Sequence, residues 1–311
     1  MVRTLTFHAV DVGDGGQAWA ARARADWRRV FGLVAPESLT DEGAAAALAT
    51  FRRHMPELVP VLERLADSLD HPYGAAVLTH TIFKPIFTGC SQTVIDGALV
   101  RNYDLHPDES PEAIHRSHFL RPVIGMAEGL WGLLDGMNDA GLAVSLTFGG
   151  RPVHGPGFAC PLVVRHLLET CATAAEAWDR LRDLPVVHPQ NLTLVDRNEA
   201  MTVHVGPDRE ATRAEETCTT NHQDRPVPAE QERITRTGER LVALRRTAAA
   251  EDFLRPPLYQ TDYDGWLGTL YTAAYRPAEG RVTYLWPGER WEQSFASFSP
   301  GVRSVRVGEY G

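Results

Sequence analysis

The stretch "FTGCSQTVIDGALVRNYD", residues 87–104, has the pattern of two short strands joined by a tight turn. Asp96 and Gly97 stand between "TVI" and "ALV". Such a pair is a strong hairpin signal, because a type I′ turn needs positive φ at both central positions. If these two residues form the loop, Cys90 faces Tyr103 across the hairpin. The turn therefore folds the segment "RNYD" back beside the cysteine.

The hairpin places an arginine and an aspartate next to the cysteine. Side chains alternate along a strand, so Arg101 shares the face of Cys90 and lies diagonal to its thiol, where a positive charge favours the nucleophilic thiolate. Asp104 falls opposite Gly89 on the other face, so we expect its carboxylate to contact the backbone nitrogen of Cys90. If the Gly89–Cys90 bond were cut, that nitrogen would become an α-amine with a pKa of about 7.7–8.0, able to act as base for its own thiol.

The composition indicates a soluble globular protein. Hydrophobic residues make up 43% and charged residues 23% of the 311 residues, enough for one large domain or two of ordinary size. The net charge is −9 and no Lys/Arg block stands out, so we expect neither nucleic acid nor membrane as a primary partner. The opening "MVRTLTFHAVDVGDGG" lacks the apolar run of a secretory signal, and no stretch is apolar for long enough to span a bilayer. We therefore expect a cytoplasmic location.

The other thiols and the histidines give no metal signal. The cysteines form no C-x-x-C pair, which argues against a disulfide framework and a structural zinc site: Cys90, Cys160, Cys171 and Cys218. We expect the last three to be small buried apolar residues. His115 and His118 have a spacing that can ligate a metal from a helix, but no acidic or cysteine partner is near in sequence, so we favour a solvated loop. We expect neither a metal nor another cofactor.

Helices are expected in blocks. The chain up to about His80 is predicted to be mainly helical, with Thr40 as an N-cap and with Pro56 and Pro60 dividing the pieces. Two further helices are expected in "CPLVVRHLLETCATAAEAWDRLRDLP", the second opened by Thr173 in a capping box. A charged helix is expected over about residues 229–250.

Strands are also expected in blocks. Alternating runs between residues 90 and 150 predict antiparallel hairpins, and further hairpins are expected at 191–205 and 269–288. This arrangement argues against a doubly wound parallel sheet. It favours an α+β fold of antiparallel sheets with helices layered on them.

A series of short motifs follows between Phe87 and Gly288: "GCSQ" (89–92), "RNYD" (101–104), "GMNDAGLAVSLTF" (136–148), "NLTLVDRNEAMTVHV" (191–205), "TTNH" (219–222), "TGER" (237–240) and "TLYTAAYRPAEGRVTYLWPG" (269–288). In their order and spacing they resemble the N-terminal nucleophile (Ntn) hydrolases, in particular the penicillin acyltransferase and choloylglycine hydrolase branch of linear amide C–N hydrolases. The resemblance implies a four-layer αββα sandwich of two antiparallel sheets with a helical N-terminal leader. It also implies two parts, a small chain 1–89 and a catalytic domain 90–311, which stay associated after self-cleavage.

The resemblance assigns roles to individual residues. It implies that Cys90 is the nucleophile and, after cleavage of the Gly89–Cys90 bond, the new N-terminus. Arg101 would lie beside the thiol and Asp104 would hold the α-amine. The Asn221 side-chain amide would donate to the oxyanion of the tetrahedral intermediate.

Two further positions give possible support. Arg240 in "TGER" is similar to the arginine of a Ser-x-x-Arg element, with threonine in place of serine. Thr147 stands where bile-salt hydrolase members carry a second asparagine, which leaves the second oxyanion donor open.

These roles imply an amidohydrolase or acyltransferase that acts on a small acyl amide or acyl thioester through a thioester intermediate. Two alternatives stay open. One is a non-processed, non-catalytic relative that binds a small acylated ligand. The other is a papain-like cysteine hydrolase in which His222, next to Asn221, serves as the base for Cys90.

Overall fold

We analysed a computed structural model of the chain, which describes residues 2–84, 88–110, 112–223, 226–265 and 267–308. Phe87, the first residue of the hairpin stretch quoted above, lies outside the described residues.

The larger of two β-sheets has nine strands in the order β10-β9-β8-β7-β6-β5-β4-β1-β14. Its neighbouring strands are antiparallel except for the parallel pair β1–β4. The strands are β1 (Arg3–Gly13), β4 (Ala113–His118), β5 (Pro122–Glu128), β6 (Gly132–Asn138), β7 (Ala143–Phe148), β8 (Gln190–Val195), β9 (Ala200–Gly206), β10 (Arg209–Arg213) and β14 (Gly301–Val307).

The smaller sheet has five antiparallel strands in the order β13-β12-β11-β3-β2. They are β2 (Gly89–Ile95), β3 (Ala98–Leu105), β11 (Gly268–Arg276), β12 (Arg281–Trp286) and β13 (Glu289–Ser294). The cysteine hairpin of the sequence is the pair β2–β3, so it forms one edge of this sheet.

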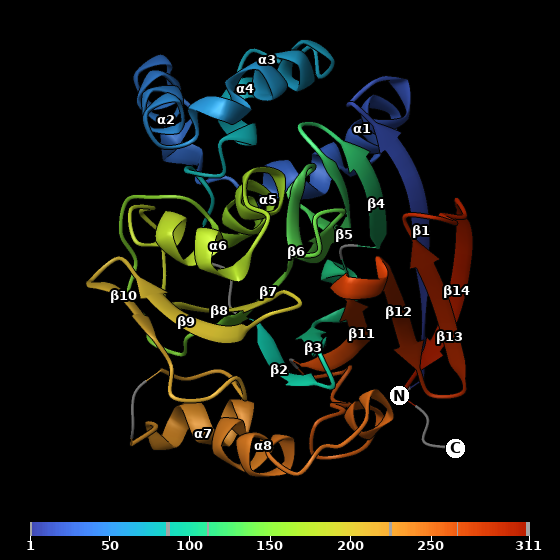
Figure 1. The fold of residues 1–311 in the computed structure, drawn as a ribbon. Coiled ribbons are helices and arrows are strands. Elements are labelled where there is room, and N and C mark those ends of the chain that lie inside the picture. Colours follow the sequence, from blue (N-terminus) through green and yellow to red (C-terminus); the bar gives the residue numbers. More distant parts are fainter. Residues whose placement is uncertain (1, 85–87, 111, 224–225, 266, 309–311) are drawn as a thin grey trace.

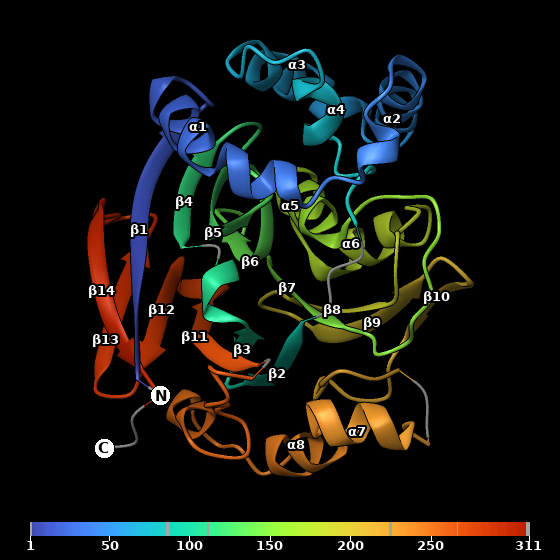
Figure 2. The ribbon, with the colours of Figure 1, turned by 180° about the vertical axis from the view of Figure 1, so that it is seen from behind.

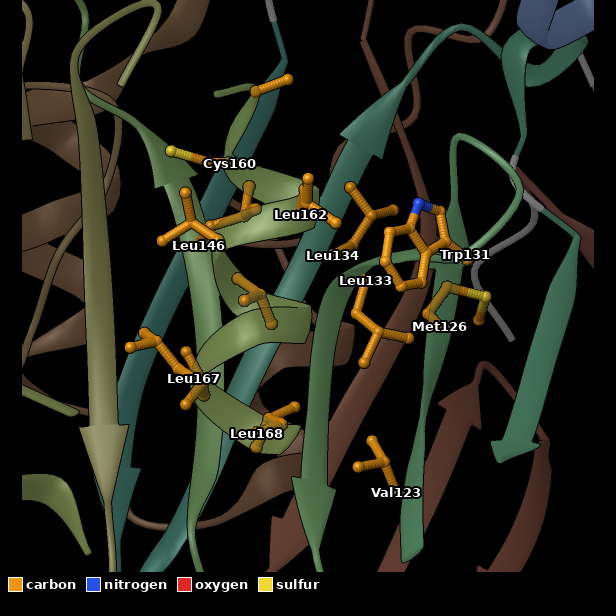
Figure 3. Close-up of a cluster of buried hydrophobic side chains, with 14 of the residues drawn as sticks. Val123, Met126, Trp131, Leu133, Leu134, Leu146, Cys160, Leu162, Leu167 and Leu168 are labelled. Carbon is orange, nitrogen blue, oxygen red and sulfur yellow. The ribbon is translucent and has the colours of Figure 1, made fainter. Parts of the chain in front are cut away.

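Helices cover the outer faces of both sheets (Figure 1). On the larger sheet, α5 (Cys160–Thr170) and α6 (Ala174–Leu181) pack on the strands from β5 to β9. Figure 3 shows Leu167 and Leu168 of α5 in the same apolar cluster as Leu133 and Leu146 of the strands beneath.

The smaller sheet is covered on the opposite side of the molecule (Figure 2). There α7 (Ala229–Thr235), α8 (Thr237–Leu244) and the 3₁₀ turn Ala250–Leu254 form the outer layer. Leu241 and Phe253 of this layer pack against Val100 of β3. The strands β2 and β3 face β7 and β8 of the larger sheet. The predicted α+β architecture, with two sheets between helical layers, is confirmed.

The N-terminal segment is mainly helical, as predicted, but it begins with a strand. Its helices are α1 (Gln17–Gly32), α2 (Asp41–His54), α3 (Val59–Asp67) and α4 (Gly74–Leu78). Before them, β1 lies between β4 and β14 within the larger sheet. The sequence carried a signal for this strand, because the apolar residues Leu5, Phe7 and Ala9 stand at alternate positions. All three side chains are buried in the structure. The segment is therefore part of the sandwich as well as a helical leader.

Most local predictions are confirmed. Thr40 and Thr173 accept backbone hydrogen bonds as the N-caps of α2 and α6. The charged helix expected over residues 229–250 breaks at Arg236, whose φ of +49° ends α7, and α8 follows. His115 and His118 lie on strand β4, not in a solvated loop. His115 is buried and His118 is exposed.

No helix of the described residues is long and apolar enough to cross a membrane.

We predict that Phe7→Ala destabilises the fold because its ring links β1 to the smaller sheet. The ring is fully buried and lies 6.3 Å from the Tyr271 ring and 5.1 Å from the Trp286 ring, between centroids. The free energy of unfolding, measured by urea denaturation, should fall by about 3–5 kcal/mol. Val302→Ala on the neighbouring strand is the control, since Val302 is 65% exposed and its truncation should change stability by less than about 0.5 kcal/mol. Equal effects of the two substitutions would contradict the prediction.

Candidate active site

The hairpin has the predicted turn and register. Asp96 and Gly97 have φ values of +48° and +72°, as a two-residue loop of this kind requires. Cys90 pairs with Tyr103. The backbone alone thus brings "RNYD" beside the cysteine.

The Cys90 thiol is fully buried and lies against an arginine. Nη2 of Arg101 donates to Sγ over 3.1 Å, and Thr88 Oγ1 lies 3.7 Å from the same sulfur. Burial raises the pKa of the Cys90 thiol, and the positive charge of Arg101 lowers it by a smaller amount. Arg101 therefore favours the thiolate as predicted, but desolvation outweighs it and the resting group is the thiol.

Arg101 is itself held by a carboxylate that the sequence analysis missed. Its Nη1 donates to Asp135 Oδ2 at 2.7 Å and to the Leu134 carbonyl at 3.1 Å. Asp135 also accepts hydrogen bonds from the hydroxyls of Tyr271, at 2.6 Å, and Tyr275. A signal for Asp135 existed: it is a lone charge within the apolar run "GLLDGM", and a fully buried carboxylate is rarely left unpaired.

The backbone nitrogen of Cys90 has a different partner from the one predicted. It donates to Oδ1 of Asn221 at 2.9 Å. The expected contact with the Asp104 carboxylate is not found in the described structure, because an amide nitrogen carries one hydrogen and Asn221 accepts it. Asp104 lies opposite Gly89 as predicted, and accepts hydrogen bonds from Thr269 Oγ1 at 2.7 Å and Arg240 Nη2 at 2.6 Å. Burial raises the pKa of Asp104, while these two partners lower it by less.

Arg240 joins the two groups around this nitrogen. Its Nη1 lies 3.1 Å from Asn221 Oδ1, and its Nη2 forms the ion pair with Asp104. All three side chains are fully buried. The supporting arginine suggested by "TGER" is thus in direct contact with Asp104, the predicted partner of the Cys90 nitrogen, and with Asn221, its partner in the structure.

Threonines hold the Asn221 segment in place. The Thr237 hydroxyl accepts a hydrogen bond from the backbone nitrogen of Asn221 at 2.8 Å, so threonine serves where the resemblance expects serine. The Thr147 hydroxyl donates to the Thr220 carbonyl at 3.0 Å and accepts from Asn191 Nδ2 at 3.0 Å. Its proton is directed at the loop, so Thr147 supports Asn221 and does not supply a free oxyanion donor in this arrangement.

Asn221 uses its amide nitrogen as well as its oxygen. Nδ2 donates to the carbonyls of Thr88, at 3.3 Å, and Phe148, at 3.2 Å. The amide group of Asn221 therefore contacts the backbone on both sides of the Gly89 carbonyl.

The alternative base, His222, points elsewhere. Its Nδ1 lies 2.8 Å from Thr237 Oγ1 and 3.3 Å from Thr220 Oγ1. Among the described residues, the Cys90 sulfur contacts Arg101 and Thr88, so it does not form a papain-like cysteine–histidine pair with His222.

Of the other cysteines, Cys160 and Cys171 are buried as expected, whereas Cys218 is only partly buried.

A cavity of about 280 Å³ lies next to two neighbours of Cys90. Thr88 and Tyr103, the neighbours of Cys90, form part of its wall. The wall is mainly apolar and comes from both the N-terminal segment and the rest of the chain: Arg29, Gly32, Leu33, Phe83, Lys84, Thr88, Tyr103, Leu105, Glu109, Glu128, Leu134, Leu146, Ala159, Pro161, His188 and Gln190. The cavity thus lies next to residues that neighbour Cys90, and it can take a small apolar group.

Two substitutions should move the pKa of Cys90 in opposite directions. Arg101→Met removes the positive charge beside the sulfur and should raise the pKa, whereas Asp104→Asn removes a nearby negative charge and should lower it. NMR titration of the labelled Cys90 Cβ in the two variants measures the shifts. Arg28→Met, an exposed arginine, is the control. Shifts of the same sign in both variants would contradict the electrostatic explanation.

Comparison with known proteins gives a family match. The family model described as acyl-coenzyme A:6-aminopenicillanic acid acyl-transferase matches residues 92–291. No curated protein sequence matches the chain.

Solved structures show only distant similarity. A mutant of the conjugated bile acid hydrolase from Clostridium perfringens is 11% identical, with a TM-score of 0.45, over 73% of this chain and 97% of that one. Penicillin V acylase from Agrobacterium tumefaciens is 13% identical, with a TM-score of 0.38, over 70% and 90%. The Caenorhabditis elegans ortholog of N-acylethanolamine-hydrolyzing acid amidase is 17% identical, with a TM-score of 0.35, over 61% and 92%.

The family model covers more than half of the chain, including both strands of the site from Gln92 onward and the Asn221 and Arg240 segments. The chain therefore belongs to the acyl-coenzyme A:6-aminopenicillanic acid acyl-transferase family.

Proposed function

We propose that the chain is a self-processing enzyme whose N-terminal nucleophile is Cys90. The observation that carries this proposal is that the sulfur and the backbone nitrogen of Cys90 each have a polar side-chain partner. The Cys90 sulfur contacts Arg101 at 3.1 Å, while its backbone nitrogen contacts Asn221 at 2.9 Å. A simple thiol nucleophile needs only the first contact. The second has a chemical role when the nitrogen becomes a free amine.

Self-cleavage begins when the Cys90 thiol attacks the carbonyl carbon of Gly89. The C–N bond breaks, the thiol proton ends on the released nitrogen, and Gly89 is held as a thioester on the Cys90 sulfur. Water hydrolyses the thioester and leaves a carboxylate at Gly89 and a free thiol and α-amine at Cys90. The products are chains 1–89 and 90–311.

In turnover, the α-amine takes the thiol proton and the sulfur attacks the acyl carbon of the substrate. Asn221 Nδ2, which contacts the Thr88 carbonyl in the uncut chain, donates to the oxyanion of the tetrahedral intermediate. The ammonium then protonates the leaving amine, and an acyl thioester remains on Cys90. Asp104 and Arg240 fix Asn221 and the charge around the amine.

The acyl-enzyme can react with water or with an amine. Reaction with water completes hydrolysis, and reaction with an amine completes acyl transfer. We propose a small-molecule acyl amide or acyl thioester as substrate. The mainly apolar wall of the cavity supports an apolar acyl group.

The two chains should stay together after the cut. Strand β1 of the small chain is an interior strand of the larger sheet, between β4 and β14, and the N-terminal segment adds hydrogen bonds to the rest of the chain. Trp131 Nε1 donates to the Leu78 carbonyl at 2.8 Å, and Trp19 Nε1 donates to the Leu130 carbonyl at 3.2 Å. These contacts do not depend on the Gly89–Cys90 bond.

Intact-mass analysis of freshly purified protein tests the proposal. We expect two fragments with the break before Cys90, which co-elute in native gel filtration, and a single uncut chain for Cys90→Ala. A wild-type chain that stays whole on long incubation and hydrolyses no amide would overturn the proposal and favour the non-catalytic alternative.

A substitution at Gly89 should slow the cleavage. A Cβ atom there would lie 3.0 Å from both Asp104 Cβ and Leu267 Cδ1, so the Gly89 backbone or these side chains would have to shift and would disturb the alignment of the Gly89 carbonyl. Gly89→Ala should slow fragment formation by about ten- to hundredfold, followed by mass spectrometry over time. Gly301→Ala is the matched control because its Cβ would meet no atom within 4 Å. Cleavage of Gly89→Ala at the wild-type rate would contradict the steric argument.

A further inference from the structure

Tyr103 and Glu128 form a polar wall of the cavity near Cys90. The chemistry of this polar wall indicates which functional group the acyl chain carries. We propose that the enzyme selects neutral apolar acyl groups with a hydroxyl close to the carbonyl, bound between Tyr103 and Glu128. This inference rests on the proposed function, because the acyl group must occupy the cavity next to the nucleophile.

Glu128 presents an unused acceptor to the cavity. It is 6% exposed and lies at the end of β5. Its Oε1 accepts from Arg29 Nη1 at 2.9 Å and from the backbone nitrogen of Gly129 at 2.8 Å. Among the described residues, no hydrogen bond reaches Oε2. A carboxylate oxygen that no protein group reaches is left for water or for a ligand hydroxyl to donate to.

Tyr103 presents a hydroxyl to the same cavity. The side chain is 2% exposed, and in the described part of the chain its hydroxyl has no hydrogen-bond partner. Burial and the negative charge of Glu128 raise the pKa of Tyr103, so the hydroxyl stays protonated and can donate. A ligand hydroxyl between the two groups would accept from Tyr103 and donate to Glu128 Oε2, which satisfies both.

The charges around the cavity favour a neutral ligand. Glu128 is paired with Arg29, and the exposed rim carries one further cation and one further acid, Lys84 and Glu109. Burial lowers the pKa of His188 to about 4, so this residue is neutral near pH 7. A carboxylate on the acyl group would meet Glu128, and an ammonium would meet Arg29. A hydroxyl avoids both repulsions.

The register places the polar wall near the reacting carbon. Tyr103 is paired with Cys90 in the hairpin, and its ring lies 4.9 Å from the Arg101 guanidinium carbon. The hydroxyl should therefore lie near the carbonyl end of the acyl chain. Because Arg29 belongs to the N-terminal segment and Glu128 does not, the binding wall is built from both sides of the cleavage point.

A set of acyl amides of one fluorogenic amine tests the proposal on the processed enzyme. The acyl groups are octanoyl, octanoyl with a hydroxyl on the third carbon, octanoyl with a terminal hydroxyl, and octanoyl with an ammonium or a carboxylate on the third carbon. We expect kcat/KM to be about ten- to hundredfold higher for the hydroxyl near the carbonyl than for plain octanoyl. The terminal hydroxyl and the two charged groups should give no such gain.

Variants assign the preference to the polar wall. Tyr103→Phe and Glu128→Gln should each reduce the ratio of kcat/KM between the hydroxylated and plain substrates, whereas Tyr73→Phe, outside the cavity wall, should keep the wild-type ratio. Equal kcat/KM for the hydroxylated and plain substrates, or a preference for a charged group, would overturn this inference while the proposed amide hydrolysis stands. Processed enzyme that cleaves none of the amides would overturn both.

Discussion

The site depends on a buried guanidinium that lies between a thiol and a carboxylate. Arg101 on β3 contacts Cys90 on β2 and Asp135 on β6, so one side chain ties the cysteine to the opposite sheet. A buried arginine without a partner would cost several kcal/mol, and Asp135 supplies that partner. Two tyrosine hydroxyls from β11 in turn donate to the Asp135 carboxylate. The distance between the two sheets and the environment of the thiol are therefore set by the same contacts.

A second buried ion pair repeats this arrangement at the backbone nitrogen. Arg240 on α8 pairs with Asp104 on β3 and shares Asn221 with the nitrogen of Cys90. One guanidinium thus acts on the sulfur and the other on the nitrogen of the same residue. The first ties the hairpin to the larger sheet, and the second ties it to the helical layer outside the smaller sheet. Displacement of either layer would move the sulfur or the backbone nitrogen of Cys90.

The sequence predicted what is local and missed what is distant. Asp96 and Gly97 determine the turn, and the turn determines which residues face Cys90, so the hairpin register could be predicted in full. Asp135 is 34 positions from Arg101, and no local pattern links them. The expected contact between the Asp104 carboxylate and the Cys90 nitrogen was wrong, because the amide hydrogen goes to Asn221, which lies 131 positions from Cys90.

The same limit applies to the N-terminal segment. Its helices were predicted from caps and prolines, which are local signals, whereas β1 depends on two partners that are distant in the sequence, β4 and β14. Within the described residues β14 pairs only with β1, so the last strand of the large sheet is attached through the first. Loss of residues 1–89 would remove β1 from the sheet interior, expose its core positions and leave β14 without a neighbour. The segment that precedes Cys90 is thus part of the sandwich that holds Cys90, and this explains physically why the proposed cleavage at Gly89 need not release it.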